Sequence, residues 1–156
     1  MIAGKAWLFA ACVGLWASCA SLQDGSESQG VNEGINEGVS VVRLERSPCY
    51  GPCPTYTVEV FEGGRAAYHG VRFVEMEGDW HGQVKSAALQ KVLEIARDIH
   101  FDGLDASYDN PRIMDLPSQT FTIEGHTVMS RYGGPDFGPL KDAIESMVAG
   151  GDWHKE

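Results

Sequence analysis

Hydrophobic and polar residues alternate with a period of two in the middle of the chain, the spacing that turns one side of a β-strand toward a core. The alternation is cleanest in the segment that places Tyr56, Val58 and Val60 on one face. Glu62-Gly63-Gly64 follows it and predicts a hairpin turn, and Gly70 marks a candidate bulge in the returning strand. The predicted strands are Val39–Arg46, Thr55–Phe61, Arg65–Val74 and Trp80–Val84.

Two later segments change to the spacing of an amphipathic helix, with apolar residues at i, i+3, i+4 and i+7. The first begins at Ser86, which suits an N-cap, and stops before Gly103. The second follows Asp136 and stops at Gly150. Their apolar stripes are Leu89, Val92, Leu93, Ala96 and Ile99, and Phe137, Leu140, Ile144, Met147 and Val148. Between the helices, Thr120–Ile123 and Thr127–Tyr132 flank the turn Glu124-Gly125-His126 as a second hairpin.

Strands that come in groups, with helices between the groups, favour the α+β class. We therefore expect a single domain over residues 39–156, built as an antiparallel sheet of hairpins with the two amphipathic helices packed on one face. The chain has 156 residues, of which 43% are hydrophobic, so it is long enough to bury one core.

The N-terminal residues carry the pattern of an export signal. Lys5 precedes an uncharged stretch of twelve residues, Ala6–Ala17, which is shorter than the roughly 20 residues that a membrane-spanning helix needs. The stretch ends in Trp16-Ala17-Ser18-Cys19, which resembles the bacterial lipoprotein signal, although Trp16 stands where that pattern has an aliphatic residue. This predicts a signal peptide over residues 1–18 and acylation of Cys19. Cleavage after Ala20 is the alternative and would release a soluble periplasmic or secreted protein.

Residues 19–38 contain four acidic residues, no basic residue and no aromatic residue, so we expect an acidic, disordered tether. The acyl chains on Cys19 would hold the protein on a membrane. Ala20, rather than an aspartate, follows that cysteine. In the sorting pattern of Gram-negative lipoproteins this directs the protein to the outer membrane, so we expect it there, facing the periplasm.

The charge balance narrows the range of partners. There are 12 basic and 22 acidic residues, which gives a formal net charge of −10. Nucleic acids and anionic membrane surfaces are bound through clustered positive charge, so we expect no nucleic-acid partner and a membrane contact made only by the lipid anchor.

Cysteine chemistry is confined to a short loop. Cys12 would leave with the signal peptide and Cys19 would be acylated, which leaves Cys49 and Cys53. In an oxidising compartment a lone pair at this spacing, in a loop rich in proline and glycine, predicts a structural disulfide. The alternative is a thiol-redox or copper site, similar to the motif of Sco-type thioredoxin-like proteins, with His69 or His126 supplying nitrogen. A period-2 strand follows the motif where a thioredoxin-like site would open a helix, which favours the disulfide.

The loop also carries a resemblance to a family. The run from Leu44 to Tyr56, with its core Ser47-Pro48-Cys49-Tyr50-Gly51-Pro52-Cys53-Pro54, resembles the opening of the bacterial family known as domain of unknown function 6438. Asp115-Leu116-Pro117-Ser118 and the closing helix fit the same family, so the likeness covers about residues 40–148. The resemblance implies a secreted or lipoprotein-borne domain and brings no catalytic residue with it.

One repeat remains after these assignments. Gly78-Asp79-Trp80-His81 recurs as Gly151-Asp152-Trp153-His154, and the two copies could bring histidines and carboxylates to one metal ion. The first copy precedes a predicted strand and the second follows the last helix, so we favour chance recurrence with packed tryptophans. No nucleophile, base and orienting group can be assembled from the sequence. We therefore expect a non-enzymatic binding or structural module without a resident cofactor, acting on an unknown envelope protein or ligand.

Overall fold

The computed structural model describes residues 38–113 and 115–156. The predicted signal peptide over residues 1–18, Cys19 and nearly all of the predicted tether lie outside these residues. Within them, no helix has the length and apolar character needed to cross a membrane.

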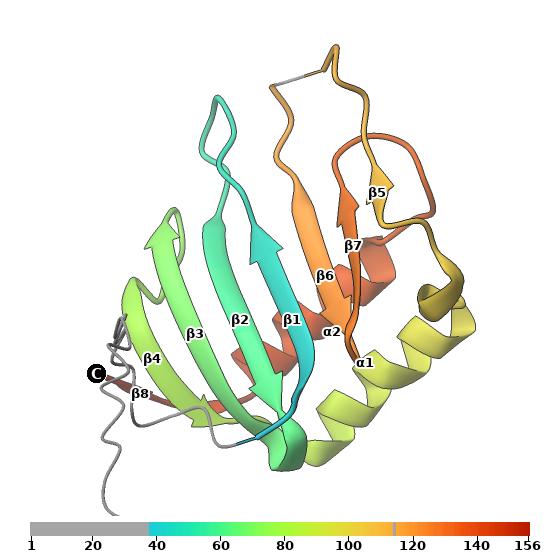
Figure 1. Cartoon of the computed structure of the whole chain (residues 1–156). Coiled ribbons are helices and arrows are strands. Elements are labelled where there is room, and N and C mark those ends of the chain that lie inside the picture. The colour runs from blue at the N-terminus through green and yellow to red at the C-terminus, as the bar shows by residue number, and fades with distance from the viewer. Residues whose placement is uncertain (1–37, 114) are drawn as a thin grey trace, which may run out of the picture. The chain divides into compact units, whose positions relative to one another are not determined.

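The described part is an α+β domain with a sheet of eight strands and two α-helices, as predicted at the level of class (Figure 1). The strand order is β5-β7-β6-β1-β2-β3-β4-β8, and every neighbouring pair is antiparallel except β5 and β7. The strands are β1 (Ser40–Arg46), β2 (Thr55–Phe61), β3 (Arg65–Arg72), β4 (Gly78–Gln83), β5 (Ser107–Tyr108), β6 (Gln119–Ile123), β7 (His126–Ser130) and β8 (Asp152–Lys155). The helices are α1 (Ser86–Asp98) and α2 (Gly138–Ala149), with two short 3₁₀ turns at Glu62–Gly64 and Phe101–Gly103.

Period-2 alternation fixes which side of the sheet meets the core. Leu44 of β1 lies opposite Val58 of β2 and Phe121 of β6, and all three side chains are fully buried. The buried strand residues form one cluster with Leu89 and Val92 of α1 and with the buried stripe of α2. Residues between the buried positions are partly or fully exposed, so the opposite face of the sheet carries most of the polar side chains.

The helix ends differ in detail from the predicted caps. Lys85, not Ser86, is the N-cap of α1, and no side chain caps that end. Asp136 lies one residue before the N-cap of α2, where its carboxylate accepts a hydrogen bond of 2.8 Å from the Gly138 amide. Gly150 is the C-cap of α2, at the predicted stop.

The strand predictions need corrections, since β3 ends at Arg72 rather than Val74 and β7 ends at Ser130 rather than Tyr132. Strand β4 begins at Gly78 rather than Trp80, and His126 belongs to β7 rather than to the turn before it. The register of β2 against β3 shifts between the partners Gly70 and Arg72, so the bulge lies next to the expected glycine. Strands β5 and β8 were not expected, since two and four residues are too few to show an alternating pattern.

Candidate functional site

Four connections lie at the same end of the sheet, where β1, β3 and β7 end and β2, β4 and β6 begin (Figure 1). Each connection exposes one large apolar side chain. Tyr50 lies between β1 and β2, Phe73 between β3 and β4, Leu116 between β5 and β6, and Tyr132 between β7 and α2; they are 97%, 53%, 42% and 52% exposed. The described part has only two other exposed large apolar residues. Val71 lies near the same end of the sheet, and Val39 lies at the far end. We call Tyr50, Phe73, Leu116 and Tyr132 the loop-end residues.

The connection between β1 and β2 is closed by the predicted disulfide. Cys49 and Cys53 are bonded, with their Cα atoms 5.7 Å apart. The Cys53 amide donates to the Gly51 carbonyl at 2.9 Å, and the Thr55 hydroxyl donates to the Cys53 carbonyl at 3.3 Å. Tyr50 therefore stands at the tip of a loop whose backbone is restrained by a covalent bond and by three prolines.

Hydrogen bonds join this loop to the one before β6, although 71 residues separate them. The Ser47 amide donates to the Ser118 carbonyl at 3.0 Å. In return, the Ser118 amide and hydroxyl both lie 2.8 Å from the Ser47 hydroxyl oxygen. The two segments that carry the family resemblance, Ser47–Pro54 and Asp115–Ser118, are thus brought together by the fold.

The connection between β3 and β4 holds Phe73 outward in a left-handed backbone conformation, with φ of 56°. This conformation is uncommon for a bulky residue and costs roughly 1–2 kcal/mol. The Arg72 guanidinium lies 5.6 Å from the centre of the Phe73 ring. Gly70 makes the fold-back of this connection possible, because a Cβ there would lie 1.8 Å from the Met76 carbonyl oxygen.

Beneath the loops, a polar cluster joins the flanks of the disulfide loop to α2. The Glu145 carboxylate accepts hydrogen bonds from Tyr56 at 2.8 Å, Arg46 at 3.0 Å and Lys141 at 3.2 Å. Burial, reinforced by the nearby Glu145 carboxylate, raises the pKa of Tyr56 far above its usual 10. Burial with the same carboxylate raises the pKa of Tyr68, which stacks on Tyr56, to about 12. Both phenols are therefore protonated at physiological pH, and the Tyr56 phenol donates to Glu145.

The structure does not bring together the residues of the alternative copper site. His69 of β3 contacts Asp79 of β4 near the end of the sheet that holds the disulfide. His126 lies at the other end, where its Nε2 donates to the Leu104 carbonyl at 3.0 Å. Across residues 38–113 and 115–156, no three His, Cys, Asp or Glu side chains converge closely enough to hold a metal ion.

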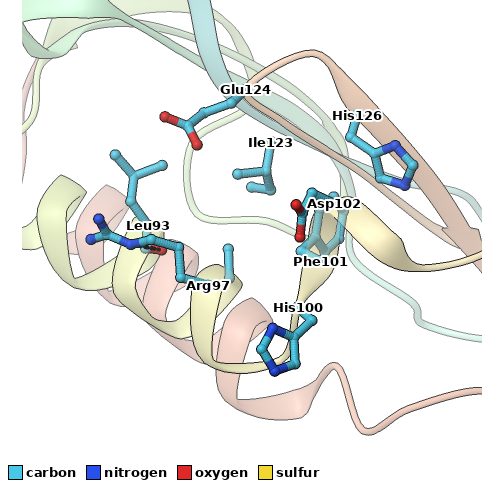
Figure 2. A pocket seen from close by; sticks show the side chains of 9 residues that line it. Leu93, Arg97, His100, Phe101, Asp102, Ile123, Glu124 and His126 are labelled. Carbon is cyan, nitrogen blue, oxygen red and sulfur yellow. Dashed lines mark hydrogen bonds between the residues drawn. The ribbon is translucent and has the colours of Figure 1, made fainter.

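His126 lines a depression of about 500 Å³ between the end of α1 and the β6–β7 turn (Figure 2). This volume is within the range of small-molecule pockets. His100 and Glu124, which both have positive φ values of 51° and 47°, line the same depression together with Arg97 and Asp102. Figure 2 shows their polar groups aimed in different directions, so they define no single ligand orientation.

The two copies of the Gly-Asp-Trp-His repeat form neighbouring strands, contrary to our reading of their contexts. The first copy opens β4 and the second enters β8, and the strands pair so that His81 lies opposite His154. The tryptophans pack as expected: Trp153 donates to the Val148 carbonyl at 2.8 Å and meets Tyr68 edge to face. Sequence analysis did not single out Glu145, Phe73 or Tyr132, because no recognisable motif surrounds them. Tyr50 and Leu116 lie in the two segments that carry the family resemblance.

Comparison with known proteins gives one match. The family described as Domain of unknown function (DUF6438) matches residues 40–147, and the chain belongs to this family. No curated protein and no solved structure matches the chain.

Proposed function

We propose that this chain is an envelope lipoprotein whose folded domain is a non-catalytic binding module and whose loop-end residues contact a partner protein. The single observation that carries the proposal is the distribution of exposed apolar side chains. Five of the six in the described part lie at one end of the sheet, one in each of four connections and Val71 beside them. Exposed large apolar side chains that gather at one end of a domain favour protein association.

Restraint of the loops supports the same proposal. A loop whose backbone is already restrained loses less conformational entropy on binding, so a given contact yields more affinity. The disulfide restrains the backbone that carries Tyr50, the Ser47 and Ser118 hydrogen bonds restrain the neighbouring connection, and Gly70 permits the fold-back that presents Phe73. Tyrosine and phenylalanine are enriched at protein interfaces, and tyrosine is also enriched among the residues that contribute most of the binding energy. The partner that fits is an envelope protein with an apolar groove able to receive aromatic side chains.

The proposal also includes the packing of the two helices on the sheet. We take both helices to cover the face of the sheet that carries Leu44 and Val58, which leaves the other face in water. The shared cluster of buried residues and the contact between α1 and α2 support this arrangement. A lipid on Cys19 and a tether over residues 19–38 would then present the loop end at a distance from the membrane.

The test replaces Tyr50, Phe73 or Leu116, one at a time, with a photoreactive phenylalanine analogue in the full chain expressed in cells. Each position is expected to give the same discrete crosslinked adduct on illumination. Val39 is the matched control, since it is exposed and apolar but lies at the opposite end of the sheet. Equal crosslinking from Val39, or adducts that differ at each position, would contradict a single partner at the loop end.

A further inference from the structure

The end of β3 departs from regular strand geometry over three consecutive residues, Val71, Arg72 and Phe73. In the pairing of β3 with β2, the register passes from Gly70 directly to Arg72, so Val71 is the extra residue of a β-bulge. Phe73 follows with a left-handed φ of 56°. All three side chains are exposed. Bulges and residues in sparsely populated backbone conformations gather at functional sites, where they redirect side chains, so this segment is a candidate for specific recognition.

The bulge turns Arg72 away from the core side of the sheet. Continued alternation would place Arg72 on the same side as Tyr68, which belongs to the buried cluster. With Val71 inserted, Arg72 pairs instead with Thr55, which alternates with the buried Tyr56 and so lies on the other side. The irregular backbone therefore places a cation among the exposed apolar side chains at this end of the sheet.

The Arg72 guanidinium is oriented but not neutralised. It lies over the Phe73 ring, 5.6 Å from the ring centre. Stacking on an aromatic face leaves the N–H donors of a guanidinium, which lie in its own plane, free to bind a further group. Within residues 38–113 and 115–156, Arg72 forms no ion pair, although three other arginines are each paired with a carboxylate. Glu75 and Glu77 lie in the same connection, and neither is paired with Arg72.

We infer that Arg72 binds a carboxylate of the partner protein, at the border of the apolar groove that receives the loop-end residues. A guanidinium and a carboxylate form two parallel hydrogen bonds, which fix orientation as well as contributing affinity. Arginine is also enriched among the residues that contribute most of the binding energy of interfaces. This inference rests on the proposed function, and it adds the chemistry of the partner surface, which is an acidic side chain beside an apolar groove.

The first experiment measures crosslinking from Tyr50, replaced by the photoreactive phenylalanine analogue, in the full chain expressed in cells. Arg72→Gln in this parent chain should reduce the yield of the discrete adduct at least about tenfold, because the partner's carboxylate is then desolvated without a counter-charge. Arg65→Gln is the matched control, since Arg65 is also an exposed arginine of β3 but lies at the opposite end of the strand. Its adduct yield should equal that of the parent chain. Both substitutions are at exposed positions, so both variants should unfold at the same denaturant concentration as the parent.

The second experiment exchanges the charges. Mass spectrometry of the adduct identifies the partner and its crosslinked peptide. Arg72→Glu should abolish the adduct, because two carboxylates then face each other. Replacing the partner's acidic residues near the crosslinked peptide with arginine, one at a time, should restore the adduct of Arg72→Glu at one of them.

The outcomes separate this inference from the proposed function on which it rests. Absence of a discrete adduct from the parent chain would overturn both. A discrete adduct from the parent chain with equal yields from Arg72→Gln and Arg65→Gln would overturn only the assignment of Arg72 to a carboxylate. Failure of every charge exchange to restore the adduct of Arg72→Glu would overturn it as well.

Discussion

Tyr56→Phe isolates the bond that ties the start of β2 to α2. The substitution removes only the phenolic oxygen, which donates to Glu145 at 2.8 Å, and keeps the ring that stacks on Tyr68 at 5.4 Å between ring centres. A hydrogen bond to a charged group contributes about 1.5–3 kcal/mol to stability. Glu145 keeps Arg46 and Lys141 as donors and is partly exposed, so water can take the vacated place. We therefore expect a loss near the lower limit, about 1.5 kcal/mol, in the free energy of unfolding at pH 7.

The same variant should change the response to alkali. The pKa of Tyr56 is higher in the folded state than the usual 10 that it takes when unfolded, so the folded state holds its proton more tightly. The stability linked to this proton is present below pH 10 and is lost as the pH rises above 10. The wild type should therefore lose stability more steeply above pH 10 than Tyr56→Phe, and the contribution of Tyr68, whose pKa is raised to about 12, should remain in both between pH 10 and about 12.

Denaturant unfolding followed by fluorescence, at pH 7 and at several values above 10, measures both effects. Tyr132→Phe is the matched control, because Tyr132 is exposed, and its change should stay within about 0.5 kcal/mol. If Tyr56→Phe were as stable as the control, or if its slope above pH 10 equalled that of the wild type, the cluster would not anchor β2 as described.

Three further predictions concern other parts of the chain. The intact mass of protein from the membrane fraction should correspond to a chain that begins at an acylated Cys19 and has no free thiol; an unlipidated chain that begins at Ser21 would refute the anchor. The double variant Cys49→Ser, Cys53→Ser should unfold with about 2 kcal/mol less free energy and an unchanged metal content, and lower copper content would instead support the copper alternative. Glu124→Asn should gain up to about 1 kcal/mol in thermal or denaturant unfolding, because asparagine suits the positive φ of that two-residue turn; no gain would mean that the turn carries no strain.

Much of the fold could be predicted from local sequence patterns. The alternation in residues 39–61, the hairpin turn at Glu62–Gly64 and both helical stripes depend on neighbours within a few residues, and the structure has elements at each of these places. The disulfide was predictable for the same reason, because Cys49 and Cys53 are four residues apart in a loop that turns back on itself.

Contacts between distant segments could not be read in this way. Arg46 meets Glu145 across 99 residues and Ser47 meets Ser118 across 71, and no spacing rule links such positions. Strand β8 is four residues long and pairs with a strand about 70 residues earlier, so its alternation is too short to be recognised. The repeated Gly-Asp-Trp-His was the one sequence signal that linked β4 and β8. It could not be interpreted without the pairing of these two strands, which only the three-dimensional structure shows.

The most direct test of the loop-end proposal separates stability from binding. Tyr50, Phe73, Leu116 and Tyr132 are each replaced by alanine in one chain, which also carries the photoreactive residue at Val71, the remaining exposed apolar position at this end. The account predicts unfolding within about 2 kcal/mol of the unsubstituted chain, since exposed residues contribute little to the core, and loss of at least about nine-tenths of the crosslinked adduct. An undiminished adduct from a folded protein would contradict the account.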